Sequence, residues 1–203
     1  MTLSRTLAPL RRVFLLLVGA VVLLAATPAF AGAPTDWLKA RQQELFKLLE
    51  KEADNKKKIA TVIEESLDVD HIAEASMGDQ WAKLTDAQKK EFKGLVKQLV
   101  TAAYEKNLKK VLPYEISYPG EDSKGDGKSL VKMRAKHKTD TRADEIKIDF
   151  LVRQKDGKFK IIDIIPEDVS TIDSYRSQFV KIYKDKGYDE LVKKMKEKIA
   201  KGQ

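Results

Sequence analysis

The chain has 203 residues, a formal net charge of +8 at pH 7 and no cysteine. The lack of cysteine excludes disulfides, thiolate metal sites and cysteine nucleophiles together. Basic and acidic residues are mixed throughout and form no dense basic block, so we expect no nucleic acid among the partners.

The first 31 residues are typical of a secretory signal peptide. Three arginines lie within residues 5–12, and an almost unbroken apolar run of 14 residues follows at 13–26. This run is shorter than the roughly 18–20 residues that cross a bilayer, and residues 29–31 (Ala-Phe-Ala) fit the small-x-small cleavage rule. We predict export to the periplasm with cleavage near Ala31, although an uncleaved anchor helix is the alternative. Cleavage would leave a single domain, residues 32–203. Because the leader holds three arginines and no acids, the net charge of this domain is +5.

Helical periodicity dominates the first half of this domain. Apolar residues three and four apart predict helices at residues 35–53 and 56–67, a short one within 68–81, and a long one from 85 to about 110. Gly78 is expected to end the short helix. Thr85 and Gln88 form a capping box, which opens the longest helix.

The second half changes to a period of two residues, which is typical of half-buried strands. The alternation predicts strands at residues 114–118, 129–138, 145–153 and 158–165, followed by helices at 171–185 and 189–200 with Gly187 between them. Asp156-Gly157 is a strong hairpin signal between the last two strands. We therefore predict an α+β fold in which helices pack on one face of a curved antiparallel sheet of about four strands.

Catalytic motifs are absent from the sequence. The only histidines are His71, next to two acids at a helix start, and His137, at the end of a lysine-rich strand. No metalloprotease, nucleophile-elbow or phosphate-loop pattern occurs. Asp163 interrupts an isoleucine-rich strand, and we interpret it as a structural acid bonded to the backbone or to Arg176. The acid pair at residues 167–168 could bind a metal, but helix capping explains it more simply.

The apolar residues of the sheet and the helices allow two interpretations. They could form an ordinary core, or the two layers could stand apart and leave a cavity that binds an apolar ligand. Composition and periodicity alone leave both open and indicate an exported, non-enzymatic α+β domain.

Two stretches narrow this choice. Residues 69–108 contain, in order, Ile72-Ala73, Gly78, Trp81, Leu84-Thr85, Gln88, Phe92 and Tyr104. Residues 159–187 contain Phe159, Ile162, Asp163, Glu167, Val169, Ser170, Tyr175-Arg176, Phe179 and Gly187. This ordered set resembles the MlaC, or toluene-tolerance, family of periplasmic phospholipid-binding proteins. The chain departs from the family pattern at Asp168, where Gly is usual, and at Phe159, where Trp is common.

The resemblance implies a carrier and not an enzyme, with no cofactor. The expected role is to shuttle phospholipid between an outer-membrane lipoprotein and porin complex and an inner-membrane ABC transporter complex with its membrane-anchored substrate-binding subunit, which maintains outer-membrane lipid asymmetry. Burying two acyl chains of roughly 30 methylenes, at about 0.8 kcal/mol each, is worth on the order of 25 kcal/mol. Such a ligand needs a dry slot at or above the upper end of the usual range of about 300–1,000 Å³.

We expect the acyl chains to lie between the apolar face of the sheet and the helices, in a lipid-sized cavity. The candidate lining residues are Val131, Met133, Ile146, Ile148, Phe150, Ile162, Ile164, Val169, Ile172, Tyr175 and Phe179, with Ile72, Met77 and Leu99 opposite them.

Three alternatives remain open at this stage. A lipoprotein chaperone of the LolA type would hold lipid chains attached to protein, and a relative that handles hopanoids would hold a different lipid. A small periplasmic hydrolase would need a polar pocket around Asp163 and His137.

Overall fold

The structure, a computed structural model, describes residues 32–201, so the predicted signal peptide and its cleavage site lie outside the described residues. The helices are α1 (Ala33–Leu49), α2 (Glu52–Ser66), α3 (Val69–Met77), the 3₁₀ helix η1 (Gly78–Lys83), α4 (Asp86–Lys110) and α5 (Thr171–Ala200). The strands are β1 (Tyr114–Gly125), β2 (Lys128–His137), β3 (Ile146–Lys155) and β4 (Lys158–Pro166). The predicted α+β single domain is confirmed.

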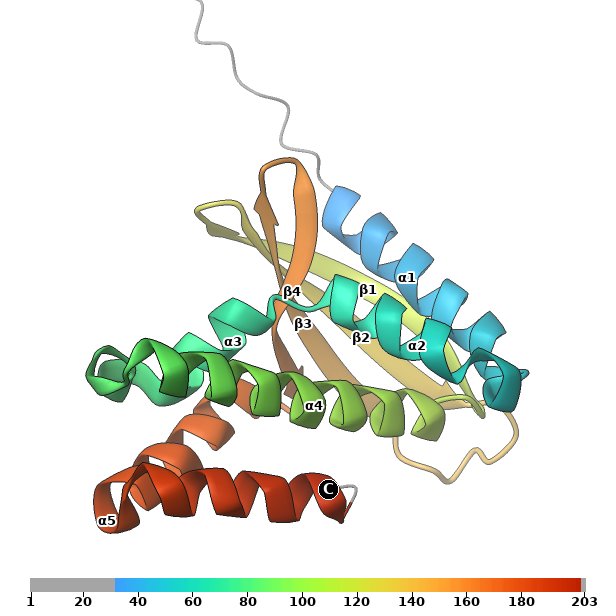
Figure 1. The fold of residues 1–203 in the computed structure, drawn as a ribbon. Coiled ribbons are helices and arrows are strands. Elements are labelled where there is room, and N and C mark those ends of the chain that lie inside the picture. The colour runs from blue at the N-terminus through green and yellow to red at the C-terminus, as the bar shows by residue number, and fades with distance from the viewer. Residues whose placement is uncertain (1–31, 202–203) are drawn as a thin grey trace, which may run out of the picture.

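The four strands form one open sheet in the order β1-β2-β3-β4, and every neighbouring pair is antiparallel. Figure 1 shows α1, α2 and α4 against the sheet, with the second part of α5 beyond α4. Val131, Met133, Ala135, Phe150 and Val152 alternate along β2 and β3, and all are buried. Since successive side chains of a strand point to opposite faces, these residues form the face that the helices cover.

Strand β1 is longer than predicted. The alternating pattern ends at Tyr118, but the strand continues to Gly125. The pairing with β2 shifts between Ser117 and Gly120, so an irregularity carries the strand past Pro119. Proline is compatible with this position because β1 is an edge strand.

The opposite edge of the sheet is partly covered by the chain that joins α2 to α3. Leu67 forms an isolated parallel bridge with Ile161 of β4, and the Asp68 N–H donates to the Ile161 carbonyl at 2.9 Å. The Asp68 carboxylate then accepts from the His71 N–H at 3.0 Å and caps α3. This cap fixes where α3 begins relative to the sheet.

Strand β4 contains an irregularity that matters for the cavity. Phe150 of β3 pairs with Ile164 and Val152 pairs with Ile161, so the register shifts between Leu151 and Val152. Two residues lie between Ile161 and Ile164 on β4, whereas one lies between their partners on β3. This is the pattern of a β-bulge, which locally changes the direction of side chains.

Helix α4 begins as predicted. The Thr85 hydroxyl accepts from the Gln88 N–H at 3.2 Å, and the Gln88 side chain accepts from the Thr85 N–H at 3.0 Å, which completes the capping box. Its buried side includes Phe92, Leu99 and Tyr104.

The last helix is bent sharply at Gly187, as the sequence predicts. Its φ of 82° and ψ of 178° are non-helical and divide α5 into two parts. Beyond the bend, the Tyr188 hydroxyl donates to the Gln88 carbonyl at 2.8 Å, and Lys196 pairs with Glu91 at 3.0 Å. The second part of α5 is thereby held along α4.

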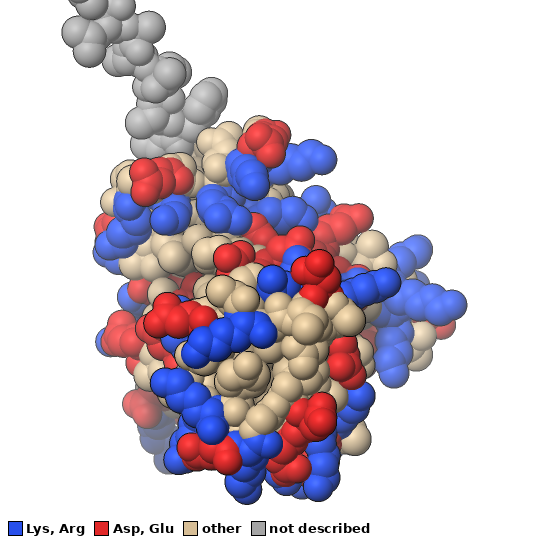
Figure 2. Space-filling model, turned by 60° about the vertical axis from the view of Figure 1, so that its left-hand side comes forward, with Lys and Arg blue, Asp and Glu red and all other residues tan. Residues whose placement is uncertain are grey.

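Basic and acidic side chains are interspersed over the face that Figure 2 presents, with no large area of a single sign. Among residues 32–201, none of the helices combines the length and the apolar composition that a bilayer crossing requires.

Candidate functional site: an apolar cavity between the sheet and the helices

A cavity of about 520 Å³ lies between the sheet and the helices α4 and α5. Its wall includes Met133 of β2, three residues of β3, the second half of β4 and the first turns of α5, with Ala103 and Leu108 of α4 opposite. The volume falls within the usual range for ligand cavities. It is smaller than the slot expected for two acyl chains.

The structure places nine of the fourteen candidate residues on the cavity wall. These are Ile72, Met133, Ile146, Ile148, Phe150, Ile164, Val169, Ile172 and Tyr175. The other five, Met77, Leu99, Val131, Ile162 and Phe179, are buried away from the wall.

Two of these five have clear reasons for lying elsewhere. Ile162 falls in the bulge of β4, so it does not share the face of Ile164 despite their two-residue spacing. The Phe179 ring lies edge-on to Phe92, with centroids 5.6 Å apart, and stacks on Tyr175. Phe179 therefore joins α5 to α4 beside the cavity and does not border it. Met77, Leu99 and Val131 belong to the same continuous core, at most 1% exposed.

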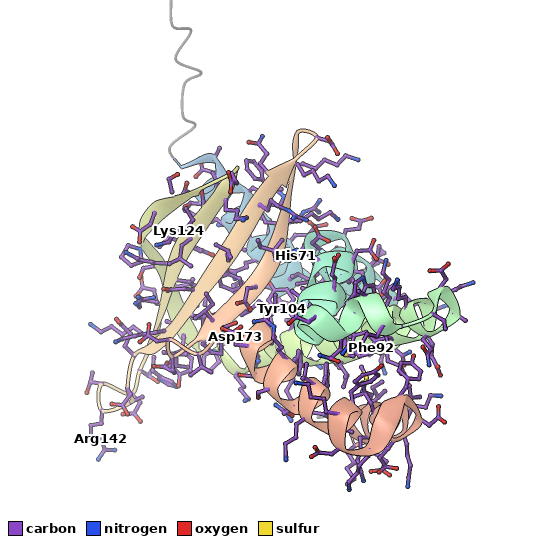
Figure 3. All side chains as sticks on the ribbon, turned by 90° about the vertical axis from the view of Figure 1, so that its left-hand side faces the viewer. His71, Phe92, Tyr104, Lys124, Arg142 and Asp173 are labelled. Atoms are coloured by element: carbon purple, nitrogen blue, oxygen red, sulfur yellow. The ribbon has the colours of Figure 1, made fainter. Side chains whose placement is uncertain are left out.

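One side of the cavity carries a buried polar group that the sequence analysis missed. Gln42 of α1 lines the wall and is 1% exposed, and its side-chain oxygen accepts a hydrogen bond from the Tyr118 hydroxyl. Tyr104 of α4 also lines the wall, and its hydroxyl is buried without a hydrogen-bond partner among the described residues. Figure 3 shows Tyr104 in the interior, between α4 and the strands. Burial raises the pKa of Tyr104 to about 12, with a partial offset from the nearby Gln42 side chain, so the group is neutral.

Asp163 is the acid that interrupts the isoleucine-rich strand, and all its hydrogen bonds are local. Its oxygens accept from the Ser170 hydroxyl at 2.6 Å, the Ile164 N–H at 2.9 Å and the Ile172 N–H at 3.2 Å. Burial raises the pKa of Asp163, and these three donors partly offset the increase. The structural interpretation is confirmed for the backbone contacts, but Arg176 is not the partner. Its guanidinium donates to the Ala75 carbonyl and to Asp173.

The turn between β4 and α5 forms part of the cavity mouth. Glu167 and Asp168 both have a positive φ, 46° and 64°, and the Val169 N–H donates to the Pro166 carbonyl across them. The Glu167 carboxylate accepts from the Lys147 N–H at 2.8 Å, which ties the turn to β3. Val169 lines the mouth and is 57% exposed, the most exposed large apolar residue described.

The residues that could have indicated an enzyme do not come together. His137 is absent from the cavity wall, and its ring nitrogen accepts from the Thr139 and Asp140 N–H groups. Burial lowers the pKa of His71, as does the nearby Arg153. Within residues 32–201, no group of three His, Asp or Glu side chains is placed to hold a metal ion. The arrangement that the hydrolase alternative requires, Asp163 with His137 in one pocket, is not formed.

A small α+β domain that keeps an apolar cavity between its sheet and its helices has the architecture of a protein that can enclose an apolar ligand. A family model for the MlaC protein matches residues 35–197, nearly the whole described chain, so this chain belongs to the MlaC family.

Among the solved structures that match, one is similar to this chain over most of the length of both. It is a phospholipid-binding protein from Ralstonia solanacearum in complex with a phospholipid, with a TM-score of 0.69 and 17% sequence identity, covering 85% of this chain and 98% of that chain. At this identity the likeness establishes a shared fold. No curated protein sequence matches this chain.

Proposed function

We propose that this protein binds a phospholipid in its cavity and carries it through the periplasm. The observation that carries the proposal is the apolar cavity. The sheet contributes five apolar residues to its wall: Met133, Ile146, Ile148, Phe150 and Ile164. Apolar groups line it, and a ligand with long acyl chains gains about 0.8 kcal/mol for each methylene that leaves water. Membership of the MlaC family supports the same conclusion.

The arrangement of the cavity suits an amphipathic ligand. The inner wall is mostly apolar, with Gln42, Tyr104 and Asp163 as buried polar members. By contrast, Asn107, Lys110, Glu167 and Val169 at the mouth are exposed. Acyl chains can lie inside while the headgroup stays at the mouth in contact with water. The known R. solanacearum structure of the same fold holds a phospholipid, which supports this class of ligand for the present chain.

The proposed path runs between two membranes. We propose that the leader is removed near Ala31 and that residues 32–203 act in the periplasm, between an outer-membrane lipoprotein and porin complex and an inner-membrane ABC transporter complex. The family and the signal-like N-terminus support this assignment. The role is that of a carrier, with no chemical step assigned to any residue.

Mass spectrometry of organic extracts tests the proposal. The protein is produced with its leader, purified from the periplasm without detergent, extracted and analysed for lipids. We expect a diacyl phospholipid at close to one molecule per chain. Recovery of no stoichiometric lipid would overturn the proposal. Lipoproteins that co-purify in place of free lipid would favour the lipoprotein chaperone, and a hopanoid would favour the hopanoid-handling relative.

A further inference from the structure

The hydrogen-bonding groups around the cavity are unevenly occupied. The two carboxylates on its wall are both engaged: Asp163 accepts from one hydroxyl and two backbone N–H groups, and Glu167 accepts from the Lys147 N–H. The buried Asp163 carboxylate is thus occupied within the fold, whereas the exposed Glu167 carboxylate accepts a single hydrogen bond and keeps one oxygen open to solvent.

Two exposed donors without a partner lie on the last two turns of α4. Lys110 is the only basic residue among those that line the cavity, it is exposed, and it forms no ion pair or hydrogen bond with any described residue. Asn107 also lines the cavity, is exposed, and makes no side-chain hydrogen bond within the described part of the chain. Lys109, the residue before Lys110, differs from Lys110 in having partners: it forms ion pairs with Glu52 at 2.7 Å and with Glu105 at 2.9 Å. Of the described lysines on the last turns of α4, Lys106 and Lys110 have no side-chain partner, and of these two only Lys110 lines the cavity.

The spacing of the two donors suits a single anionic group. Residues three apart on a helix lie on the same face, so the Asn107 amide and the Lys110 ammonium can reach the same atom or two oxygens of one group. Lysine binds phosphate as a point charge, and hydrogen bonds to a charged acceptor are roughly twice as strong as neutral ones. When acyl chains occupy the cavity, the part of the ligand that lies beside Asn107 and Lys110 is its headgroup.

From these observations we infer that Lys110 and Asn107 bind the phosphate of a lipid headgroup at the mouth of the cavity. The inference rests on the proposed phospholipid-binding function and adds to it the two residues that contact the headgroup. Through them, lipids that carry a phosphate are preferred over neutral diacyl lipids with the same chains. The acyl chains supply most of the binding, and Lys110 and Asn107 supply the preference.

The position of Lys110 also has a purely structural explanation, and the test must distinguish that explanation from headgroup binding. A lysine in the last turn of a helix is favoured by the helix dipole and by the unpaired carbonyls there. That role affects stability alone, by a few tenths of a kcal/mol. It predicts no difference between lipids with and without a phosphate.

The experiment compares lipid preference in matched variants. Delipidated wild type, Lys110→Gln, Asn107→Ala and the control Lys106→Gln are incubated with vesicles that contain phosphatidylglycerol and diacylglycerol with identical chains, and the bound lipids are quantified by mass spectrometry. Lys106 is an exposed residue of the same helix that does not line the cavity. Inorganic phosphate is titrated separately against the lipid-free protein.

We expect the wild type and Lys106→Gln to prefer phosphatidylglycerol, and Lys110→Gln to reduce this preference by about threefold to tenfold with diacylglycerol uptake unchanged. Asn107→Ala should reduce it less. An unchanged ratio in Lys110→Gln, or an equal loss of both lipids, overturns the inference and leaves lipid binding intact. Saturable binding of inorganic phosphate that depends on Lys110 would identify a free-phosphate site and also overturn it. If the wild type takes up neither lipid, the proposed function itself fails.

Discussion

The Ser170 hydroxyl donates a hydrogen bond of 2.6 Å to the Asp163 carboxylate and so joins β4 to the first residue before α5. The same hydroxyl oxygen accepts from the Asp173 N–H at 3.0 Å and caps the helix. One side chain therefore sets both where α5 begins and how it leaves the sheet. Because Ile172 and Tyr175 of this helix line the cavity, the pair also fixes one wall.

Replacement of Ser170 by Ala should lower the free energy of unfolding by about 1–2 kcal/mol, because the helix loses its cap and Asp163 loses a donor. Urea denaturation measures the change. The control is Ser177→Ala, since the exposed Ser177 hydroxyl bonds only to the Ser174 carbonyl one turn earlier. Equal stability of the two variants would show that the Asp163–Ser170 contact does not hold α5.

Replacement of Ile148 by Asp should reduce lipid loading by about tenfold or more, because a carboxylate on the cavity wall would have to lose its water against the acyl chains. Ile148 lines the cavity and is only partly buried, so the chain can still fold. Leu151→Asp is the matched control, since Leu151 lies on the same strand with its side chain on the other face. Lipid content is measured by extraction of each folded variant. Full loading of Ile148→Asp would show that the wrong face has been assigned.

Replacement of Asp68 by Asn should lower the free energy of unfolding by about 1–2 kcal/mol at pH 7. The Asp68 carboxylate forms an ion pair with Arg153, and the two side chains are 19% and 24% exposed. Asparagine can still cap α3, so the variant tests mainly the charge.

This effect should depend on pH in a defined direction. Burial alone would raise the pKa of Asp68, but the His71 N–H and the Arg153 guanidinium together lower it below the ordinary 3.8. The contribution of Asp68 is therefore complete above pH 3.8 and is lost as the pH falls through the lowered value. Urea denaturation from pH 7 to pH 3 measures it. A stability difference between wild type and Asp68→Asn that grows on acidification would contradict this assignment.

Replacement of Tyr104 by Phe should raise the free energy of unfolding by about 1 kcal/mol, because a buried hydroxyl without a partner costs free energy that the phenyl ring avoids. Tyr118→Phe is the opposite case. It removes the donor to Gln42 and should lower the stability by about 1 kcal/mol. Thermal or urea unfolding compares the two. A destabilised Tyr104→Phe would mean that the hydroxyl has a partner in the folded protein.

Replacement of Asp168 by Gly, the residue usual at this position in the MlaC family, should raise the free energy of unfolding by about 1 kcal/mol. The reason is that Gly adopts a positive φ without strain. Asp156→Gly is the control: its φ of 51° is similar, but it lies in the hairpin between β3 and β4, away from the cavity. Both variants should gain stability, and only Asp168→Gly should change the rate at which lipid exchanges with vesicles. Equal exchange rates would show that this turn does not control the mouth.

The elements of the fold could be predicted from the sequence where local rules decide them. The capping box at Thr85, the bend at Gly187 and the hairpin at Asp156-Gly157 are all present. The same rules could not predict the extension of β1 beyond Tyr118, because it depends on an irregular pairing with β2.

The cavity could be predicted only in part. Alternation identifies the apolar face of the sheet, but it does not indicate how deep a residue lies, so Val131 was expected on the wall beside Met133 and is core. The bulge that displaces Ile162 arises from strand pairing and has no local signal. Gln42, Asn107 and Lys110 were missed because polar residues on amphipathic helices resemble ordinary solvated positions.

The wall of the cavity is assembled from α1, α3, α4, three strands and α5, with Gln42 and Tyr175 as its outermost members along the sequence. No shorter portion of the chain encloses the cavity, so an incompletely folded molecule cannot hold the ligand. A ligand that binds only the folded protein in turn stabilises the folded state by mass action. Lipid-free copies would then unfold more readily than lipid-loaded ones.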